Sequence, residues 1–299
     1  MDEVKARVEI MLESANKLVR SWESLIENGG GSADIEVKEY VRGYTSSVIS
    51  SAIFGSNNSK GIELFPKFRA VMKVMHSSTL LEGLSIHRYL PTKDNRYAWG
   101  LDKEITSFIL DMTKEHSEAV SKEQPQVIME STKTGELGPL TPEQYIVDNC
   151  RNVYLPGFEV TAVASMWGLM LLASHPEWQD RIRAEVAQAC AGRPLEANMP
   201  GKMKVLKMVI QEVLRLYSGV AILTRHTLKD VQLGDVSVPE GVGIWVWLPA
   251  LHQDSEFWGP DGAKFNPERG LLIVFLGPAT LPVPTSRLVL ETELVLARA

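Results

Sequence analysis

The sequence predicts a mostly α-helical protein with a small β part late in the chain. Apolar residues recur every three or four positions through most of residues 1–217, which is the spacing of amphipathic helices. After Tyr217 short β-branched runs alternate with Gly, Asp and Pro, which is typical of short strands. The 299 residues are 44% hydrophobic and 23% charged, as in ordinary globular proteins that bury a sizeable core. We therefore expect a single domain over 1–299, mainly helical over 1–217.

Residues 218–299 are expected to hold small strands, an irregular segment and a C-terminal helix. Periodicity, Gly and Pro predict the helix bounds, which are about 4–26, 37–54, 61–77, 95–121, 141–174, 176–190 and 203–217. Strands are expected at about 220–227, 231–233 and 242–247. The polar stretch 122–140 is predicted to be a surface loop, and a last helix is expected at about 287–298.

The longest predicted helix, Thr141–Ser174, organises the chain. Thr141 and Gln144 have capping-box spacing, and Pro142 stands at the first helical position, where a missing N–H costs nothing. Residues 162–173 are apolar almost all round, which predicts burial inside a large domain. This apolar run is too short and too interrupted to span a bilayer, so we expect no transmembrane segment.

Glu159 stands in the middle of this helix, next to Pro156 and Gly157. A proline removes a helical N–H, so the helix is expected to be distorted here. A buried carboxylate at a helix distortion indicates a site. The alternative is that Glu159 points to solvent, which is the commoner fate of a single glutamate.

Glu212 and Arg215 lie three positions apart and so share one helix face. As an exposed ion pair they contribute about 0–1 kcal/mol. The helix around them is strongly apolar, however, and a buried pair needs further hydrogen-bond partners, which Arg269 could supply. Arg225 follows a predicted strand, where an exposed cation on an edge strand is the simpler interpretation.

Composition and residue spacing give no support to several function classes. The net charge of −6 gives no indication of nucleic-acid binding or of an anionic membrane surface. The two cysteines, Cys150 and Cys190, make no disulfide framework and fit a reducing compartment. The histidines lack metal-ligand spacing, so no metal site is predicted, and the charged N-terminal helix is not a secretory signal.

These features, in this order, resemble the cytochrome P450 family of heme-thiolate monooxygenases. The signature E-x-x-R is met by Glu212 and Arg215, and F-x-P-x-R is met by Phe265, Pro267 and Arg269. The long helix is similar to the family's substrate-side helix, and HPEWQDRIRAEV is typical of the helix that follows it. Together with DNCRNVYLPGFE, this segment looks most like a plant branch that oxidises gibberellin-type diterpenoids.

The resemblance implies an incomplete cytochrome P450-like fold that binds heme. It assigns Glu212, Arg215 and Arg269 to a structural triad on the proximal side of the heme. It assigns Arg225 to a contact with a heme propionate. The expected reaction is oxidation of a hydrophobic small molecule, with O2 and with electrons from an NADPH-dependent reductase.

The family relays protons to iron-bound oxygen through an acid and a neighbouring alcohol on the long helix. The acid corresponds to Glu159, but the alcohol position is Val160, which has no proton to give. Thr161 is the nearest hydroxyl and lies about 100° further around the helix. Pro156 replaces the small residue that the motif expects before Gly157.

The heme-ligand loop of the family reads F-x-x-G-x-R-x-C-x-G. Laid over it, VFLGPATLPVP places Ala279 at the arginine position and Leu281 at the cysteine position, and Gly270 replaces the aromatic after Arg269. An aliphatic side chain offers iron no lone pair, whereas a thiolate favours O–O cleavage. LETELVLARA nevertheless resembles the helix that follows this loop.

These departures lead to the hypothesis that the chain is truncated or degenerate and catalytically impaired. The alternatives are a non-catalytic helical remnant that binds a hydrophobic ligand or a protein partner, and a faulty gene model. Family members of this branch sit on the endoplasmic reticulum membrane by an N-terminal helix. We expect this chain to lack that anchor and to be soluble and intracellular.

Overall fold

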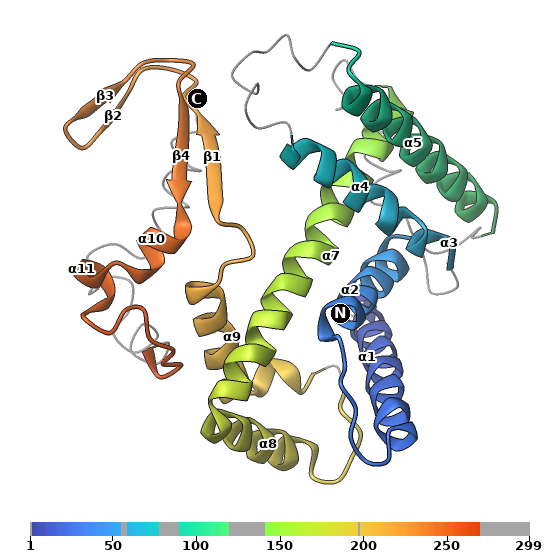
Figure 1. Cartoon of the computed structure of the whole chain (residues 1–299), viewed down its shortest axis with the longest axis vertical. Coiled ribbons are helices and arrows are strands. Elements are labelled where there is room, and N and C mark those ends of the chain that lie inside the picture. Colours follow the sequence, from blue (N-terminus) through green and yellow to red (C-terminus); the bar gives the residue numbers. More distant parts are fainter. Residues whose placement is uncertain (1, 55–58, 78–89, 120–140, 197, 270–299) are drawn as a thin grey trace. The chain divides into compact units, whose positions relative to one another are not determined.

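The computed structural model describes residues 2–54, 59–77, 90–119, 141–196 and 198–269. Helices and strands follow one another along the chain as Figure 1 labels them. The helices are α1 (Asp2–Asn28), α2 (Val37–Phe54), α3 (Ser59–Ile62), α4 (Leu64–Ser77), α5 (Lys93–Ala119), α7 (Pro142–Ser174), α8 (Pro176–Cys190), the 3₁₀ turn η2 (Pro200–Lys202), α9 (Lys204–Leu216), α10 (Leu248–Gln253) and α11 (Ser255–Trp258). The strands are β1 (Ile222–His226), β2 (Val231–Leu233), β3 (Val236–Val238) and β4 (Gly243–Trp247).

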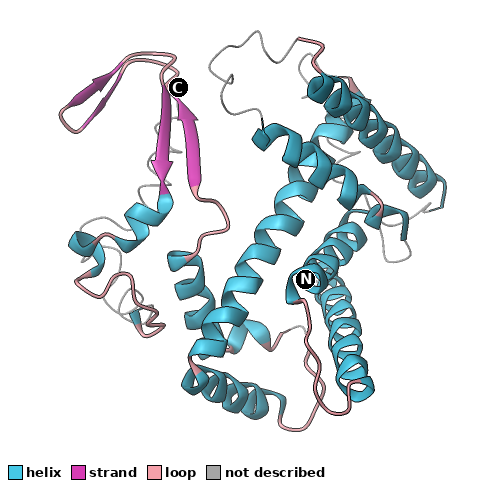
Figure 2. Ribbon diagram, viewed as in Figure 1, coloured by secondary structure: helices cyan, strands magenta, loops and turns pink. Residues whose placement is uncertain are grey.

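The predicted fold class is confirmed, because the described residues are mostly helical with a few short strands late in the chain (Figure 2). The chain divides into two compact units, Met1–Ala162 and Val163–Ala299. Helix α7 contributes its first part to one unit and its last part to the other. The assignment of residues 1–299 to one domain stays a prediction.

The core of the first unit is built by α4, α5 and the first part of α7. Its buried members are Leu64, Phe68, Ile105, Ile109, Met112, Val147, Cys150, Tyr154 and Phe158. Tyr154 and Phe158 lie one helical turn apart, so both rings face the same neighbours. Tyr154 stacks on Phe68 with ring centroids 5.1 Å apart, and Phe158 meets Phe65 edge to face at 4.7 Å.

Helices α2 and α7 approach closely at Gly157. A Cβ atom at this position would lie 2.7 Å from Cδ1 of Ile49 on α2, so a glycine allows the two helices to touch. Helix α1 lies along α2, where Trp22 meets Tyr40 edge to face at 6.2 Å. These contacts attach α2 to both of its neighbours.

The N-terminus of α7 follows the prediction. The Thr141 N–H donates to Oε1 of Gln144 over 3.3 Å, and the Gln144 N–H donates to Oγ1 of Thr141 over 3.2 Å, which is a reciprocal capping box. The distortion expected at Pro156 does not break the helix, which is continuous from Pro142 to Ser174. Buried side chains on both sides of the proline hold this turn in place.

The expected all-round burial of residues 162–173 is wrong. Leu169 and Met170 are 44% and 57% exposed, and the buried side chains of α7 lie earlier in the helix. Residues 163–168, 171 and 172 are half-buried, and the Trp167 ring stacks on Tyr217 with centroids 3.7 Å apart. Trp167, Leu171 and Leu172 pack against Trp178 of α8 and the buried side chains of α9, and this packing leaves Leu169 and Met170 exposed.

Within the described residues, α7 is the one helix long and apolar enough to cross a membrane, with a mean hydropathy of 1.4 over its best window. Core helices of soluble proteins meet the same criterion. Tyr154, Phe158 and Ala162 of α7 are buried, but only 12% of that window is buried in the described part of the chain.

The second unit combines a helical core with two small antiparallel sheets. Trp178 of α8 packs on Met208, Val209 and Val213 of α9. Strands β1 and β4 pair antiparallel, and β2 and β3 form a separate hairpin (Figure 2). The sequence did not predict β3, α10 or α11, because segments of three to six residues carry too little periodicity.

Candidate functional site

Helix α9 brings Glu212 and Arg215 together inside the second unit. Their side chains are 3% and 5% exposed, so the pair is buried and is not a surface ion pair. Nε of Arg215 donates to Oε2 of Glu212 over 2.8 Å, and Nη2 donates to Oε1 over 2.7 Å. This is a bidentate arrangement, which is among the stronger charge-assisted hydrogen bonds.

Arg215 also donates hydrogen bonds to main-chain carbonyl groups. Its Nη1 donates to the carbonyl oxygens of His252 over 2.6 Å and Gly262 over 2.7 Å, and its Nη2 lies 3.3 Å from that of Lys264. The guanidinium stands 4.8 Å from the centre of the Trp258 ring. A buried cation therefore has a partner on every side, which offsets the cost of removing it from water.

Arg269 completes this cluster. Its Nη1 donates to the carbonyl of Trp258 over 2.9 Å and its Nη2 to that of Asp261 over 2.7 Å, while Nε lies 3.7 Å from Oε1 of Glu212. The Asn266 N–H donates to the same Glu212 oxygen over 2.9 Å. Hydrogen bonding to Arg269 lowers the pKa of Asp261. The structure thus gathers the three residues of the predicted triad, and their role next to a heme stays a prediction.

His252 is a member of this cluster that the sequence did not indicate. Its Nδ1 lies 3.1 Å from the carbonyl oxygen of Arg215, so Nδ1 carries the hydrogen and donates it. Burial lowers the pKa of His252; the hydrogen bond to the Arg215 main chain opposes this, and the Arg215 charge adds to it. The neutral imidazole is therefore the form that suits the fold.

Glu159 forms an ion pair with Arg42 of α2. The side chains are 19% and 11% exposed, so Glu159 is neither a solvent-facing glutamate nor an unpaired buried one. Arg42 stands 117 residues away in the sequence. The one available sequence signal was that a buried carboxylate needs a cationic partner, and that signal does not say which cation.

Thr161 does not join Glu159. The two residues are two positions apart on a continuous α-helix, so their side chains point about 200° apart around its axis. Thr161 is exposed, and Val160 between them is half-buried. The structure therefore does not place an acid and an alcohol on one helix face at this turn, and their catalytic assignment stays a prediction.

Arg225 lies on β1, opposite Ile244 of β4 in the antiparallel register. It is half-buried, and its Nη1 donates to the Thr224 carbonyl over 2.9 Å. Leu223 and Val246 share its face of the sheet, as the alternation of strand residues requires. Its predicted contact with a heme propionate stays a prediction.

The described residues do not fit a thiolate-ligated heme. Cys150 is buried in the core of the first unit, and burial raises its pKa to about 11, so the thiol is protonated at neutral pH. Cys190 is the last residue of α8. Ala279, Leu281, Gly270 and the expected helix at 287–298 lie outside the described residues. The whole sequence contains no further cysteine.

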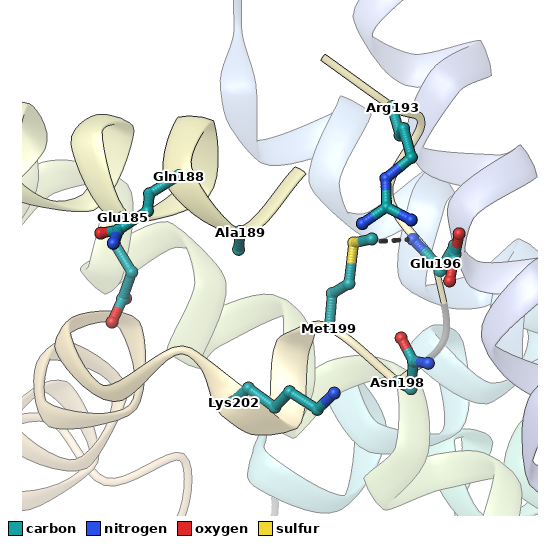
Figure 3. Close-up of a pocket in the computed structure, with 8 residues that line it drawn as sticks. All are labelled: Glu185, Gln188, Ala189, Arg193, Glu196, Asn198, Met199 and Lys202. Carbon is teal, nitrogen blue, oxygen red and sulfur yellow. Dashed lines mark hydrogen bonds between the residues drawn. The ribbon is translucent and has the colours of Figure 1, made fainter. Parts of the chain in front are cut away.

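A pocket of about 460 Å³ opens between α8 and η2 (Figure 3). It is lined by Glu185, Gln188, Ala189, Arg193, Glu196, Asn198, Met199 and Lys202. Both signs of charge are present and most of these residues are exposed. Glu185 has a clear structural task, because its carboxylate accepts the N–H groups of Val205 and Leu206 in the first turn of α9.

A second hollow of about 380 Å³ lies between α1 and α2. Leu18 and the rings of Tyr40 and Tyr44 give it a mainly apolar lining, and Gly43 stands on its wall with open space in front of it. Among the described residues, no group of three or more His, Cys, Asp or Glu could hold a metal ion.

Comparison with known proteins gives a consistent result. The family model described as cytochrome P450 matches residues 2–271. Cytochrome P450 714C2 of Oryza sativa subsp. japonica is 43% identical over 273 residues, which are 90% of this chain and 52% of the relative. Cytochrome P450 714B3 of Zea mays is 41% identical, with 90% and 51% covered. Cytochrome P450 714A2 of Arabidopsis thaliana is 35% identical, with 90% and 54% covered.

Among solved structures, a zebrafish cytochrome P450 with progesterone matches with a TM-score of 0.75. The alignment covers 89% of this chain and 62% of the zebrafish chain, at 21% identity, so it shows a shared fold. The chain spans about half the length of the curated plant relatives it matches.

Proposed function

Because the chain belongs to the cytochrome P450 family, we propose that its function is that of a heme-dependent monooxygenase acting on a hydrophobic small molecule, and that this chain by itself is impaired in that reaction. The observation that carries the proposal is the buried cluster of Glu212, Arg215 and Arg269. The bidentate Glu212–Arg215 pair and the main-chain carbonyl acceptors of Arg215 satisfy the buried charges, as a structural triad requires. The fold around it supports the family's chemistry.

The proposed impairment rests on the residues at two positions, where the family has a thiolate that binds iron and an alcohol that relays protons. Leu281 occupies the position of the thiolate ligand and Val160 that of the relay alcohol. Cys150 is buried with a pKa of about 11, so it offers no thiolate at neutral pH. Heme would supply oxygen activation when bound. The expected contributions of this chain are the triad and the Arg225 guanidinium, as a partner for a propionate.

We further propose that the substrate is a gibberellin-type diterpenoid and that the electrons come from an NADPH-dependent reductase. The support is the sequence of Asp148–Glu159 and His175–Val186, which resembles the branch that oxidises such compounds. Both statements concern the whole protein.

The test is a heme titration of the purified chain, followed by the absorption spectrum of the reduced, CO-bound form. We expect no Soret band of the thiolate type. A matched variant, Leu281→Cys, places sulfur at the aligned ligand position and is expected to produce that band. A thiolate-type band in the unaltered chain, or oxidation of a diterpenoid with reductase, NADPH and O2, would overturn the proposed impairment.

A second candidate function is non-catalytic binding of a hydrophobic ligand, which the apolar hollow between α1 and α2 favours. A hydrophobic fluorescent dye should bind there and be displaced by terpenoids without any heme spectrum. Gly43→Leu fills the open space on the wall of the hollow and should weaken dye binding. Unchanged dye affinity in this variant would count against the hollow as a site.

A further inference from the structure

We propose that Ser46 and Ser50 of α2, together with the Tyr154 phenol of α7, form a binding site for one ordered water molecule inside the first unit. All three residues lie within Met1–Ala162, so the site belongs to one compact unit. Its ligand is a small neutral molecule that both donates and accepts hydrogen bonds. The inference goes beyond the proposed function and is tested without heme, so the failure of either leaves the other standing.

Two serine hydroxyl groups of α2 are buried and need a hydrogen-bond partner. Ser46 and Ser50 are each 1% exposed. Among the residues that the structure describes, the Oγ atom of neither serine has a partner. Buried polar groups in proteins are nearly always hydrogen-bonded, either to protein or to ordered water. The neighbouring Thr45 solves the problem within its own helix, because its Oγ1 donates to the carbonyl of Arg42 over 3.2 Å.

The spacing of the two serines suits a shared ligand. They stand four positions apart on α2, so they share one face of the helix. Side chains at this spacing have Cβ atoms about 5–6 Å apart. A water that bonds two hydroxyl oxygens at about 2.8 Å each spans up to about 5.6 Å. One water can therefore reach both hydroxyl groups.

The Tyr154 phenol supplies the third contact. Its hydroxyl donates to the carbonyl of Gly61 over 2.8 Å, and a phenol oxygen is also an acceptor. Burial raises the pKa of Tyr154 to about 12, and the hydroxyl of Ser46 acts in the opposite direction, so Ser46 lies near the phenol. A bridging water joins two such neighbours without a direct bond. A buried water typically makes about three hydrogen bonds, which the three hydroxyl groups provide.

The surroundings restrict what this site can hold. Ile49 packs against the core cluster that contains Tyr154, and a Cβ at Gly157 would lie 2.7 Å from Cδ1 of Ile49, so α2 and α7 already touch beside the site. Arg42, one turn before Ser46, is engaged by Glu159. An ion would need an opposite charge to offset its burial, whereas a neutral ligand the size of water needs only the hydroxyl groups.

The first test is a double-mutant cycle on urea unfolding with Ser46→Ala, Ser50→Ala and the double variant. Each single change should raise the unfolded-to-folded ratio about 3- to 10-fold, because the water loses a hydrogen bond. The double variant should lose less than the product of the two, since both changes remove contacts of the same water.

Two results of this cycle would overturn the proposal. Alanine in place of a hydroxyl with no ligand would remove a buried unsatisfied group and lower the ratio. Hydroxyls that each bond a carbonyl of their own helix would give losses that multiply in the double variant. Ser51→Ala is the matched control, because Ser51 is a half-buried serine of the same helix and reports the higher helix propensity of alanine.

A second measurement detects the water itself. Oxygen-17 magnetic relaxation dispersion responds to water molecules that a protein holds for longer than its own tumbling time, and it does not detect hydroxyl hydrogens. The unaltered chain and Ser51→Ala should give the same dispersion, and the double variant should lose the contribution of one long-lived water. An unchanged dispersion in the double variant would refute the site, whatever its stability.

Discussion

Replacing Arg215 by methionine tests the buried cluster most directly. Methionine keeps much of the volume and removes the charge and all five donor N–H groups of the guanidinium. Glu212 then loses the cation to which it is joined by hydrogen bonds of 2.7 and 2.8 Å. The carbonyls of His252, Gly262 and Lys264 lose the donor that they share.

The expected loss follows from these contacts. Breaking one side of a buried ion pair costs about 3–5 kcal/mol. A buried carbonyl left without a donor costs about 1–3 kcal/mol when water does not reach it. We therefore expect Arg215→Met to lower the free energy of unfolding of the second unit by at least ~4 kcal/mol, a large share of the ~5–15 kcal/mol that stabilises an ordinary domain.

Urea unfolding followed by tryptophan fluorescence measures this loss, because Trp258 stands next to the guanidinium. Arg215→Lys keeps the charge but not the planar set of donors of the guanidinium, so its free energy of unfolding should fall between those of the wild type and Arg215→Met. Arg183→Met is the matched control, since Arg183 makes an exposed pair with Asp180 at 3.0 Å. If Arg215→Met destabilises no more than Arg183→Met, the cluster does not stabilise the fold and the reasoning is wrong.

Three further outcomes are expected. Gly157→Ala should destabilise the first unit in thermal unfolding, because its Cβ would lie 2.7 Å from Cδ1 and 2.8 Å from Cγ1 of Ile49. Ile49→Ala removes both atoms and should make this loss smaller, so equal losses in the two backgrounds would contradict this contact. Because burial lowers the pKa of His252 from its ordinary value of 6.5, the unfolded chain takes up the proton first as pH falls. The stability due to neutral His252 should be complete above about pH 6.5 and be lost toward the lowered pKa, and His252→Asn should flatten this profile in urea titrations at several pH values. Iodoacetamide at pH 7.5 should modify half-buried Cys190 and spare buried Cys150, whose pKa is about 11, until urea is added. Modification of both cysteines in the native chain, measured by mass spectrometry, would contradict this prediction.

The sequence was most informative where the relevant spacing is local. A separation of three positions puts Glu212 and Arg215 on one helix face, and the apolar residues that flank them along the helix indicate that the pair is buried. The capping box at Thr141 depends on four consecutive residues and was likewise predictable. Such features need no knowledge of tertiary packing.

Features that join distant segments were not predictable in this way. Arg42 has no pattern that links it to Glu159 across 117 residues, because an ion pair between helices depends on how the helices pack. The carbonyl partners of Arg215 belong to the main chain, which every residue carries, so side-chain identity gives no signal. The apolar stretch after Ala162 indicated which residues could be buried, but tertiary packing leaves Leu169 and Met170 exposed.

The main-chain carbonyls that accept hydrogen bonds from Arg215 have a consequence for sequence variation. Main-chain groups keep their geometry when a side chain changes, so the position of Lys264 can accept many residues without disturbing the bond it makes to the guanidinium. Gly262 has less freedom, because a Cβ there would come within 3.0 Å of the Gln253 carbonyl oxygen. Arg215 itself has none, because no other side chain offers the same planar set of donors. A saturation library of this segment should therefore tolerate changes at residue 264, few at 262 and essentially none at 215.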